Sequence, residues 1–195
     1  MRPVSAALSA AACVAVLLLN ACAGSPPTRF VTLSAMPAEA PVAAGPVEPV
    51  QLTALHIPAE LDRPEVVWQP APNRFEISDT ERWAAPLART MRLTLARDLE
   101  TRLPGGDFIP PDLPAPKGTR ALVVTIVGIG VPAQGDLTLD ASWAIVARNP
   151  DRVAAMHHAT LRAPMTGTNG AAQAAAISQA LGQLADRIAE SLVCR

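Results

Sequence analysis

The sequence predicts a single α+β domain in which two helices cover one face of an antiparallel β-sheet. Apolar residues recur every four positions from Trp83 to Leu99 and at helical spacing again over 171–193, as in helices that bury one side. Apolar and polar residues alternate from Leu137 to Ala147, as in a half-buried strand. Short turns separate the predicted strands, which indicates antiparallel hairpins because parallel neighbours need longer crossovers.

The first half of the domain contributes short strands. Val50–Ile57 alternates well enough for a strand, with Val50, Leu52, Ala54 and His56 on one side and Leu55 and Ile57 on the other. Glu65–Trp68 and Arg74–Ile77 form a predicted hairpin, since the prolines between them favour a turn.

The first helix is predicted to begin at Ser78, because Ser78 and Glu81 have the spacing of a capping box. Pro86 would then lie inside the helix and clash with the carbonyl of Arg82, so we expect a kink or a break there. A Pro-Gly-Gly run after Leu103 ends the helix. The apolar row of this helix comprises Trp83, Leu87, Met91, Leu95 and Leu99.

The second half contains three predicted strands and a helix. Arg120–Val131 is a nearly continuous apolar run, typical of a central strand covered on both sides. Leu137–Ala147 follows as a half-buried strand, and Val153–Arg162 returns after a turn at 149–151. Ala171–Val193 is a helix whose apolar stripe comprises Ile177, Leu181, Leu184, Ile188 and Leu192.

A processing signal precedes the domain. Arg2, the apolar stretch Val4–Leu19 and the small Ala21 have the form of a signal peptide. The run Leu-Asn-Ala-Cys that ends at Cys22 looks like a bacterial lipobox, so we expect residues 1–21 to be removed and Cys22 to be lipidated. An uncleaved transmembrane helix is the alternative by length, but alanine and serine insert weakly. The residue after Cys22 is Ala23, whereas an aspartate at that position usually retains a lipoprotein in the inner membrane. We therefore expect the outer membrane, with the domain facing the periplasm.

The length of the tether depends on one short strand. If Phe30–Leu33 pairs into a sheet, the tether is residues 22–28, roughly 20 Å long, and the domain spans 29–195 with a flexible Pro/Ala-rich loop over 34–49. If the strand does not form, the tether runs to Pro49 and reaches roughly 80 Å. We expect the first arrangement.

The residues needed for enzyme chemistry are missing. The chain has no nucleophile-elbow or phosphate-loop motif and no paired cysteine ligands. His157 and His158 are adjacent on a predicted strand and point to opposite faces, so they cannot easily share a metal. The formal net charge of −1 leaves no basic excess for nucleic acid. We therefore expect no enzyme activity, no catalytic residue, no metal and no cofactor beyond the lipid on Cys22, with Cys194 as a free thiol.

Three segments together resemble a known family. They are Leu61-Asp62-Arg63-Pro64, Asn73-Arg74 and Glu81-Arg82-Trp83-Ala84, preceded by an opening from Cys22 to Leu33 of the same kind. This joint spacing is similar to that of the PqiC/YmbA family, the ABC-type transport auxiliary lipoproteins. The resemblance implies a non-enzymatic outer-membrane partner of a lipid-trafficking system. In such a system a periplasmic MCE-domain protein and inner-membrane components move lipids between membranes.

A partner-binding surface is expected at the tip of the predicted hairpin. Trp68, Asn73 and Arg74 place a ring beside a charge on an exposed turn, and both residue types are enriched at interfaces. Asp62 and Trp83 have structural readings as a turn cap and a helix anchor. Two other functions stay open, namely a lipid carrier that encloses an acyl chain between helices and sheet, and an assembly or pilot lipoprotein for another envelope complex.

Overall fold

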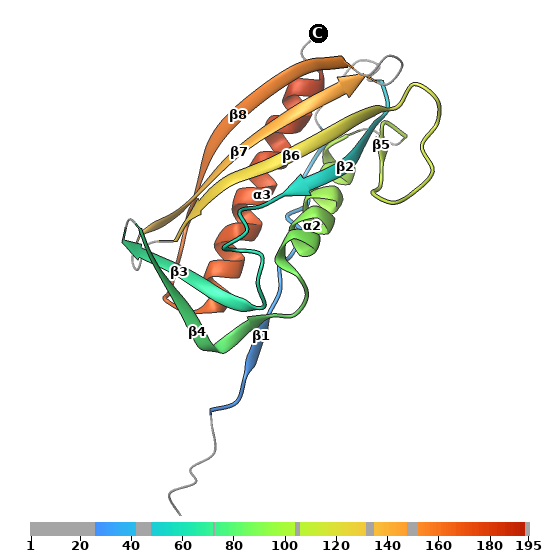
Figure 1. Cartoon of the computed structure of the whole chain (residues 1–195). Coiled ribbons are helices and arrows are strands. Elements are labelled where there is room, and N and C mark those ends of the chain that lie inside the picture. Colours follow the sequence, from blue (N-terminus) through green and yellow to red (C-terminus); the bar gives the residue numbers. More distant parts are fainter. Residues whose placement is uncertain are drawn as a thin grey trace, which may run out of the picture.

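The computed structural model describes residues 26–41, 48–71, 73–103, 106–131, 135–147 and 152–193. Its helices and strands follow one another through the chain as in Figure 1. They are β1 Arg29–Val31, β2 Val50–His56, β3 Glu65–Ala71, β4 Arg74–Trp83, α2 Leu87–Arg102, β5 Phe108–Ile109, β6 Arg120–Gly130, β7 Asp136–Ala147, β8 Arg152–Pro164 and α3 Gly170–Val193.

Two sheets and a layer of two helices make up the domain. The larger sheet has the strand order β5-β2-β6-β7-β8, and the smaller one has the order β1-β4-β3. Helices α2 and α3 pack on each other and on one face of the larger sheet (Figure 1). The smaller sheet lies at the end of the domain where the chain enters through β1, away from the C-terminus (Figure 1). The predicted α+β class is confirmed.

The length of the segment that connects two strands bears on whether they pair in parallel or antiparallel. β6, β7 and β8 form the predicted antiparallel meander. β2 pairs in parallel with β6 and with β5, and β1 pairs in parallel with β4. β3, β4 and α2 stand between β2 and β6, and this long connection is the kind of crossover that a parallel pair requires. Both sheets are therefore mixed.

The alternation predicted for β2 is wrong in its second half. Leu52 is fully buried, yet Leu55 is also buried and His56 is exposed. The register between β2 and β6 shifts between Leu52 and Ala54. Such a bulge inserts one residue and changes which side chains face the core. Leu55, rather than Ala54 or His56, therefore continues the buried side of this strand.

The predicted start of the first helix is also wrong. β4 continues through Ser78 to Trp83, and α2 begins only at Leu87. The Ser78 hydroxyl does accept the backbone N–H of Glu81 at 3.0 Å, but within the strand. Pro86 occupies the N-cap with extended backbone angles, so it precedes the helix and produces no kink. From Leu87 onward the predicted apolar row and the end of the helix near Leu103 are confirmed.

The central strand β6 is covered on one face only. Leu122, Val124 and Ile126 are buried under the helices, whereas Thr125 and Val127 are exposed. The prediction of a strand covered on both sides is wrong, because both helices pack on the same face. The apolar stripe predicted for α3 is confirmed as buried.

The segment after β1 is held in place. β1 pairs with β4, as expected for the first strand. The backbone N–H of Ser34 then donates to Ser178 Oγ at 3.0 Å, and that of Ala38 donates to Thr101 Oγ1 at 3.1 Å. Residues 34–38 of the expected loop, which we call the strap, have neither helix nor strand, and these two bonds tie them to α3 and α2. Residues 42–47, the predicted turn at 149–151 and the tether up to residue 25 lie outside the described part.

Candidate functional site

The tip of the β3–β4 hairpin carries the residues predicted to bind a partner. Asn73 has a φ of 63°, a left-handed conformation that asparagine tolerates well in turns. Arg74 follows it and is exposed, and its Nη2 donates to Glu76 Oε1 at 2.6 Å. Trp68 is the strand partner of Glu76. The hairpin therefore brings Trp68, Arg74 and Glu76 into one cluster, with Asn73 exposed at the turn.

Trp68 lines an open groove of about 230 Å³ together with Pro70, Glu76 and Thr168. Thr168 comes from the segment before α3, and no local sequence signal places it beside the hairpin. Phe75 and Ile77 on β4 are 44% and 47% exposed. Neither is among the residues predicted to bind a partner, although their alternation along β4 puts two apolar side chains on one face. Rings, apolar side chains and an arginine are what protein interfaces concentrate.

The other residues of the family-like segments hold the helices. Asp62 Oδ1 accepts the backbone N–H of Ala88 at 3.5 Å, in the first turn of α2. Glu81 Oε2 accepts the backbone N–H of Gly170 at 2.8 Å, where α3 begins. Carboxylates are favoured at helix N-termini because the first amides there lack partners in the helix. Trp83 is buried in the core. These contacts support the structural reading of Asp62 and Trp83.

A buried ionic clamp joins the strap to both helices. Asp98 Oδ1 accepts the backbone N–H of Met36 at 2.5 Å, and Arg102 Nη1 donates to the carbonyl of Met36 at 2.9 Å. Arg102 Nε also donates to Asp186 Oδ1 of α3 at 2.6 Å. Gly182 allows the strap to approach α3, because a Cβ there would lie 2.9 Å from Met36 Cβ. The side chains of Asp98 and Arg102 thus fix the backbone of one strap residue from both sides.

Burial shifts the pKa of Asp98, an acidic residue of the clamp. It raises the pKa of Asp98 to about 6, with the backbone N–H of Met36 and the charge of Arg102 opposing the shift. Asp98 Oδ2 is buried with no hydrogen-bond partner among the described residues. Buried, shifted carboxyls also occur at catalytic sites, but here the neighbouring groups are those of a structural contact.

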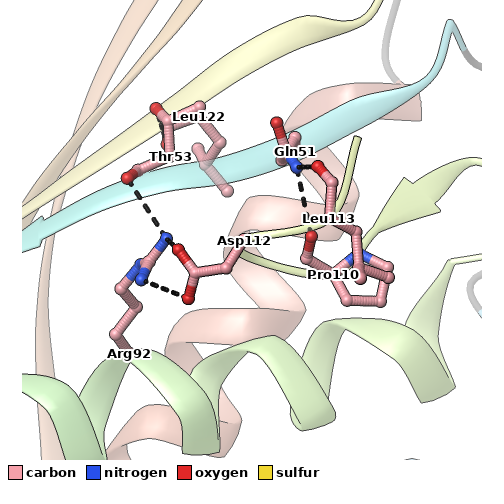
Figure 2. A network of polar contacts seen from close by, with 7 residues as sticks. All are labelled: Gln51, Thr53, Arg92, Pro110, Asp112, Leu113 and Leu122. Atoms are coloured by element: carbon pink, nitrogen blue, oxygen red, sulfur yellow. Dashed lines mark hydrogen bonds and ion pairs between the residues drawn. The ribbon is translucent and has the colours of Figure 1, made fainter. Parts of the chain in front are cut away.

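A second polar network fixes the loop between β5 and β6 (Figure 2). Arg92 of α2 makes a bidentate contact with Asp112, at 3.1 Å to each carboxylate oxygen, and also donates to the carbonyl of Thr53. Gln51 of β2 donates to the carbonyls of Pro110 and Leu113. The loop is therefore held against β2 and α2 by side chains that face it from both elements.

The structure assembles no metal or membrane-spanning site in the part it describes. No group of three or more His, Cys, Asp or Glu side chains among these residues could hold a metal ion. The His157 ring stacks on Trp143 with centroids 5.3 Å apart, while His56 and His158 are exposed. None of the described helices is long and apolar enough to cross a membrane. Cys22 and Cys194 lie outside the described residues.

The sequence matches the family model of the ABC-type transport auxiliary lipoprotein component over residues 32–189. The chain belongs to this family. The resemblance drawn from the signature segments is thereby confirmed, and the match covers the whole strap, the hairpin and most of α3. Membership makes the protein a lipoprotein-family component associated with ABC-type transport. No curated protein matches the sequence.

Solved structures share the fold of this auxiliary lipoprotein domain. One is an uncharacterized protein with a TM-score of 0.67 and 19% identity, aligned over 85% of this chain and 99% of that one. Another is protein XCC0632 from Xanthomonas campestris, of family DUF330, with a TM-score of 0.65 and 18% identity, aligned over 85% and 95%. At such identities the likeness establishes the fold alone.

Proposed function

We propose that this auxiliary lipoprotein is a non-enzymatic outer-membrane subunit of an MCE-type intermembrane lipid-transport system. In this proposal lipid on Cys22 anchors the domain on the periplasmic side, and the β3–β4 hairpin docks the periplasmic MCE-domain protein, which works with inner-membrane components. Family membership supports a role beside a transporter. The observation that carries the docking surface is the cluster of Trp68, Arg74 and Glu76 at the hairpin, where Trp68 and Glu76 line the groove.

A lipid carrier has less support from the packing. A carrier of this kind must enclose the acyl chain between the helices and the sheet. The space enclosed between the small sheet and the helices, bordered by Leu61, Trp83 and Ile177 among others, is about 10 Å³. Alanines such as Ala180, Ala185 and Ala189 are fully buried along α3, which brings its backbone close to its neighbours. An assembly or pilot lipoprotein differs from our proposal only in the partner.

Replacing Cys22 with alanine is expected to move the protein from the membrane fraction to the soluble fraction. Two or more acyl chains hold a protein on a membrane stably, and without the cysteine there is no lipid attachment. Fractionation of envelopes that express either form, followed by immunoblotting, measures this change. Cys194→Ala is the matched control and should stay in the membrane fraction. Membrane retention of Cys22→Ala would contradict the lipid anchor.

Replacing Arg74 with glutamate is expected to reduce capture of the MCE-domain protein about tenfold or more, equivalent to about 1.4 kcal/mol of binding free energy. The new carboxylate would stand beside Glu76 and leave two like charges at the tip. Fold stability should change by less than about 1 kcal/mol, because Arg74 and Glu76 form an exposed ion pair. The measurement is gentle detergent capture followed by mass spectrometry of the co-eluting proteins.

The control for this capture experiment is Arg97→Glu, an equal charge reversal at an exposed position of α2. It should leave capture unchanged. Equal recovery with folded Arg74→Glu removes the hairpin as the docking surface. Recovery of another envelope complex in place of an MCE-domain protein favours the pilot function, and bound lipid without any such protein favours the carrier.

A further inference from the structure

An apolar groove lies between the strap and the first turns of α3. Its volume is about 480 Å³, within the range of small-molecule sites of about 300–1,000 Å³. Phe30, Val31 and Met36 contribute to one wall, and Ala171, Ala174 and Ala175 to the other. The remaining lining residues are serine, threonine and glutamine, so no charged side chain lines the groove.

The two largest side chains of the groove are exposed and firmly placed. Phe30 is 66% exposed and Met36 is 42% exposed. β1 holds the backbone of Phe30 against β4, and Asp98 and Arg102 hold that of Met36 from α2. Large apolar side chains that are exposed together mark interaction surfaces. These backbone contacts fix the direction in which both side chains leave the chain.

The number of residues between Cys22 and β1 limits how far the groove can lie from Cys22. Phe30 follows Cys22 by eight residues, and an extended chain advances about 3.5 Å per residue at most. The groove therefore stays within about 28 Å of the sulfur that is proposed to carry lipid. The short link to Cys22 therefore keeps the groove close to the acyl chains of the lipids that surround the anchor.

The groove and the hairpin surface differ in their charged side chains. At the hairpin, the exposed charges of Arg74 and Glu76 lie beside Trp68, so a partner there must match charges. The groove offers apolar walls with uncharged polar groups at its margin and needs no counter-charge. Hydrocarbon matches the apolar walls because it brings no polar group that would need a partner, and the Ser178 hydroxyl at the margin is already hydrogen-bonded to Ser34 and Ala174.

We propose that this groove, with Phe30 and Met36 at its rim, is a membrane-contact surface that receives acyl chains of the monolayer in which Cys22 is anchored. The inference rests on the lipid anchor of the proposed function and adds a second, non-covalent contact with the same membrane. The domain would then lie against the bilayer through its β1 end.

The test places an environment-sensitive probe at the groove. Lipidated protein carrying Cys194→Ser and Phe30→Cys is labelled with NBD and reconstituted into phosphatidylethanolamine/phosphatidylglycerol vesicles. Phe75→Cys on the hairpin is the matched control, since it is also an exposed phenylalanine. Gln179→Cys is a second groove probe that keeps Phe30 and Met36 intact. We expect blue-shifted emission and loss of most intensity on adding doxyl-labelled lipid at positions 30 and 179, with neither change at position 75.

Each other outcome overturns the inference at a defined level. Protein that does not float with the vesicles overturns the anchor and, with it, the membrane contact. Protein that floats but whose groove probes respond like the one at position 75 overturns the groove contact alone. Groove probes that change only after purified MCE-domain protein is added assign the groove to a protein partner instead.

Discussion

Replacing Arg102 with alanine is expected to lower the free energy of unfolding by about 3 kcal/mol. This is the lower end of the range of about 3–5 kcal/mol for removing one partner of a buried ion pair, because Asp186 is 49% exposed. Arg102 is 4% exposed and donates to Asp186 and to the carbonyls of Met36 and Asp98. Without it, Asp98 loses its nearest cation and the carbonyl of Met36 loses the Arg102 donor, while the carbonyl of Asp98 keeps the hydroxyl of Thr101. Urea unfolding at pH 7.5 measures the difference.

Arg97→Ala is the matched control for this experiment. It removes the same side chain from an exposed position on the same helix and should change the free energy of unfolding by less than about 0.5 kcal/mol. A loss below about 1 kcal/mol for Arg102→Ala would show that the clamp does not hold the strap to the helices. Comparable urea m-values in all three proteins are needed for this comparison.

The stabilising contribution of Asp98 is expected to fall as the pH rises through about 6. Its pKa is about 6 in the folded protein and near 3.8 when unfolded, so the folded state binds an additional proton between these values. The protonated form is the one that burial favours, and ionisation above pH 6 places a charge in a desolvated site. Between pH 4.5 and 7.5 the loss of unfolding free energy from this group should be about 2 kcal/mol.

The variant Asp98→Asn separates the pH-dependent contribution of Asp98 to the free energy of unfolding from that of the other carboxyl groups. The amide keeps an oxygen that can accept the N–H of Met36 but does not ionise. Urea unfolding of both proteins at pH 4.5 and 7.5 should show the wild type losing about 2 kcal/mol relative to Asp98→Asn as the pH rises. A pH-independent difference between the two would mean that Asp98 titrates normally in the folded state.

The start of α2 shows why a local signal can mislead. Ser78 and Glu81 have the spacing of a capping box, and Ser78 does accept the N–H of Glu81. The Glu81 carboxylate, however, reaches Gly170 at the start of α3, far along the chain. β4 pairs with β1 from Glu81 to Trp83 and with β3 at Ile77 and Arg82, on both sides of Ser78. That pairing outweighs a short-range motif, because it depends on strands that the window around Ser78 does not contain.

The candidate site was predictable in its local part only. Asn73 and Arg74 follow from hairpin chemistry, since prolines and asparagine favour the turn that exposes them, whereas Trp68 is half-buried and packs against the core. The contribution of Thr168 depends on how the segment before α3 packs beside the hairpin. The groove beside Phe30 likewise depends on β1 and α3, which are separated by most of the chain. No pattern near the hairpin predicts the contact with Thr168, and none near Phe30 predicts the contact with α3.

The sequence by itself determined the class of the domain, the strands β7 and β8, the buried stripes of both helices, the hairpin and the family. These features rest on periodicity and short motifs, whose physical cause lies within a few neighbouring residues. Only the tertiary structure decided the parallel pairing of β2 with β6, the bulge in β2, the exposed face of β6 and the clamped strap. Each of these depends on the free energy of contacts between distant segments, which local patterns do not encode.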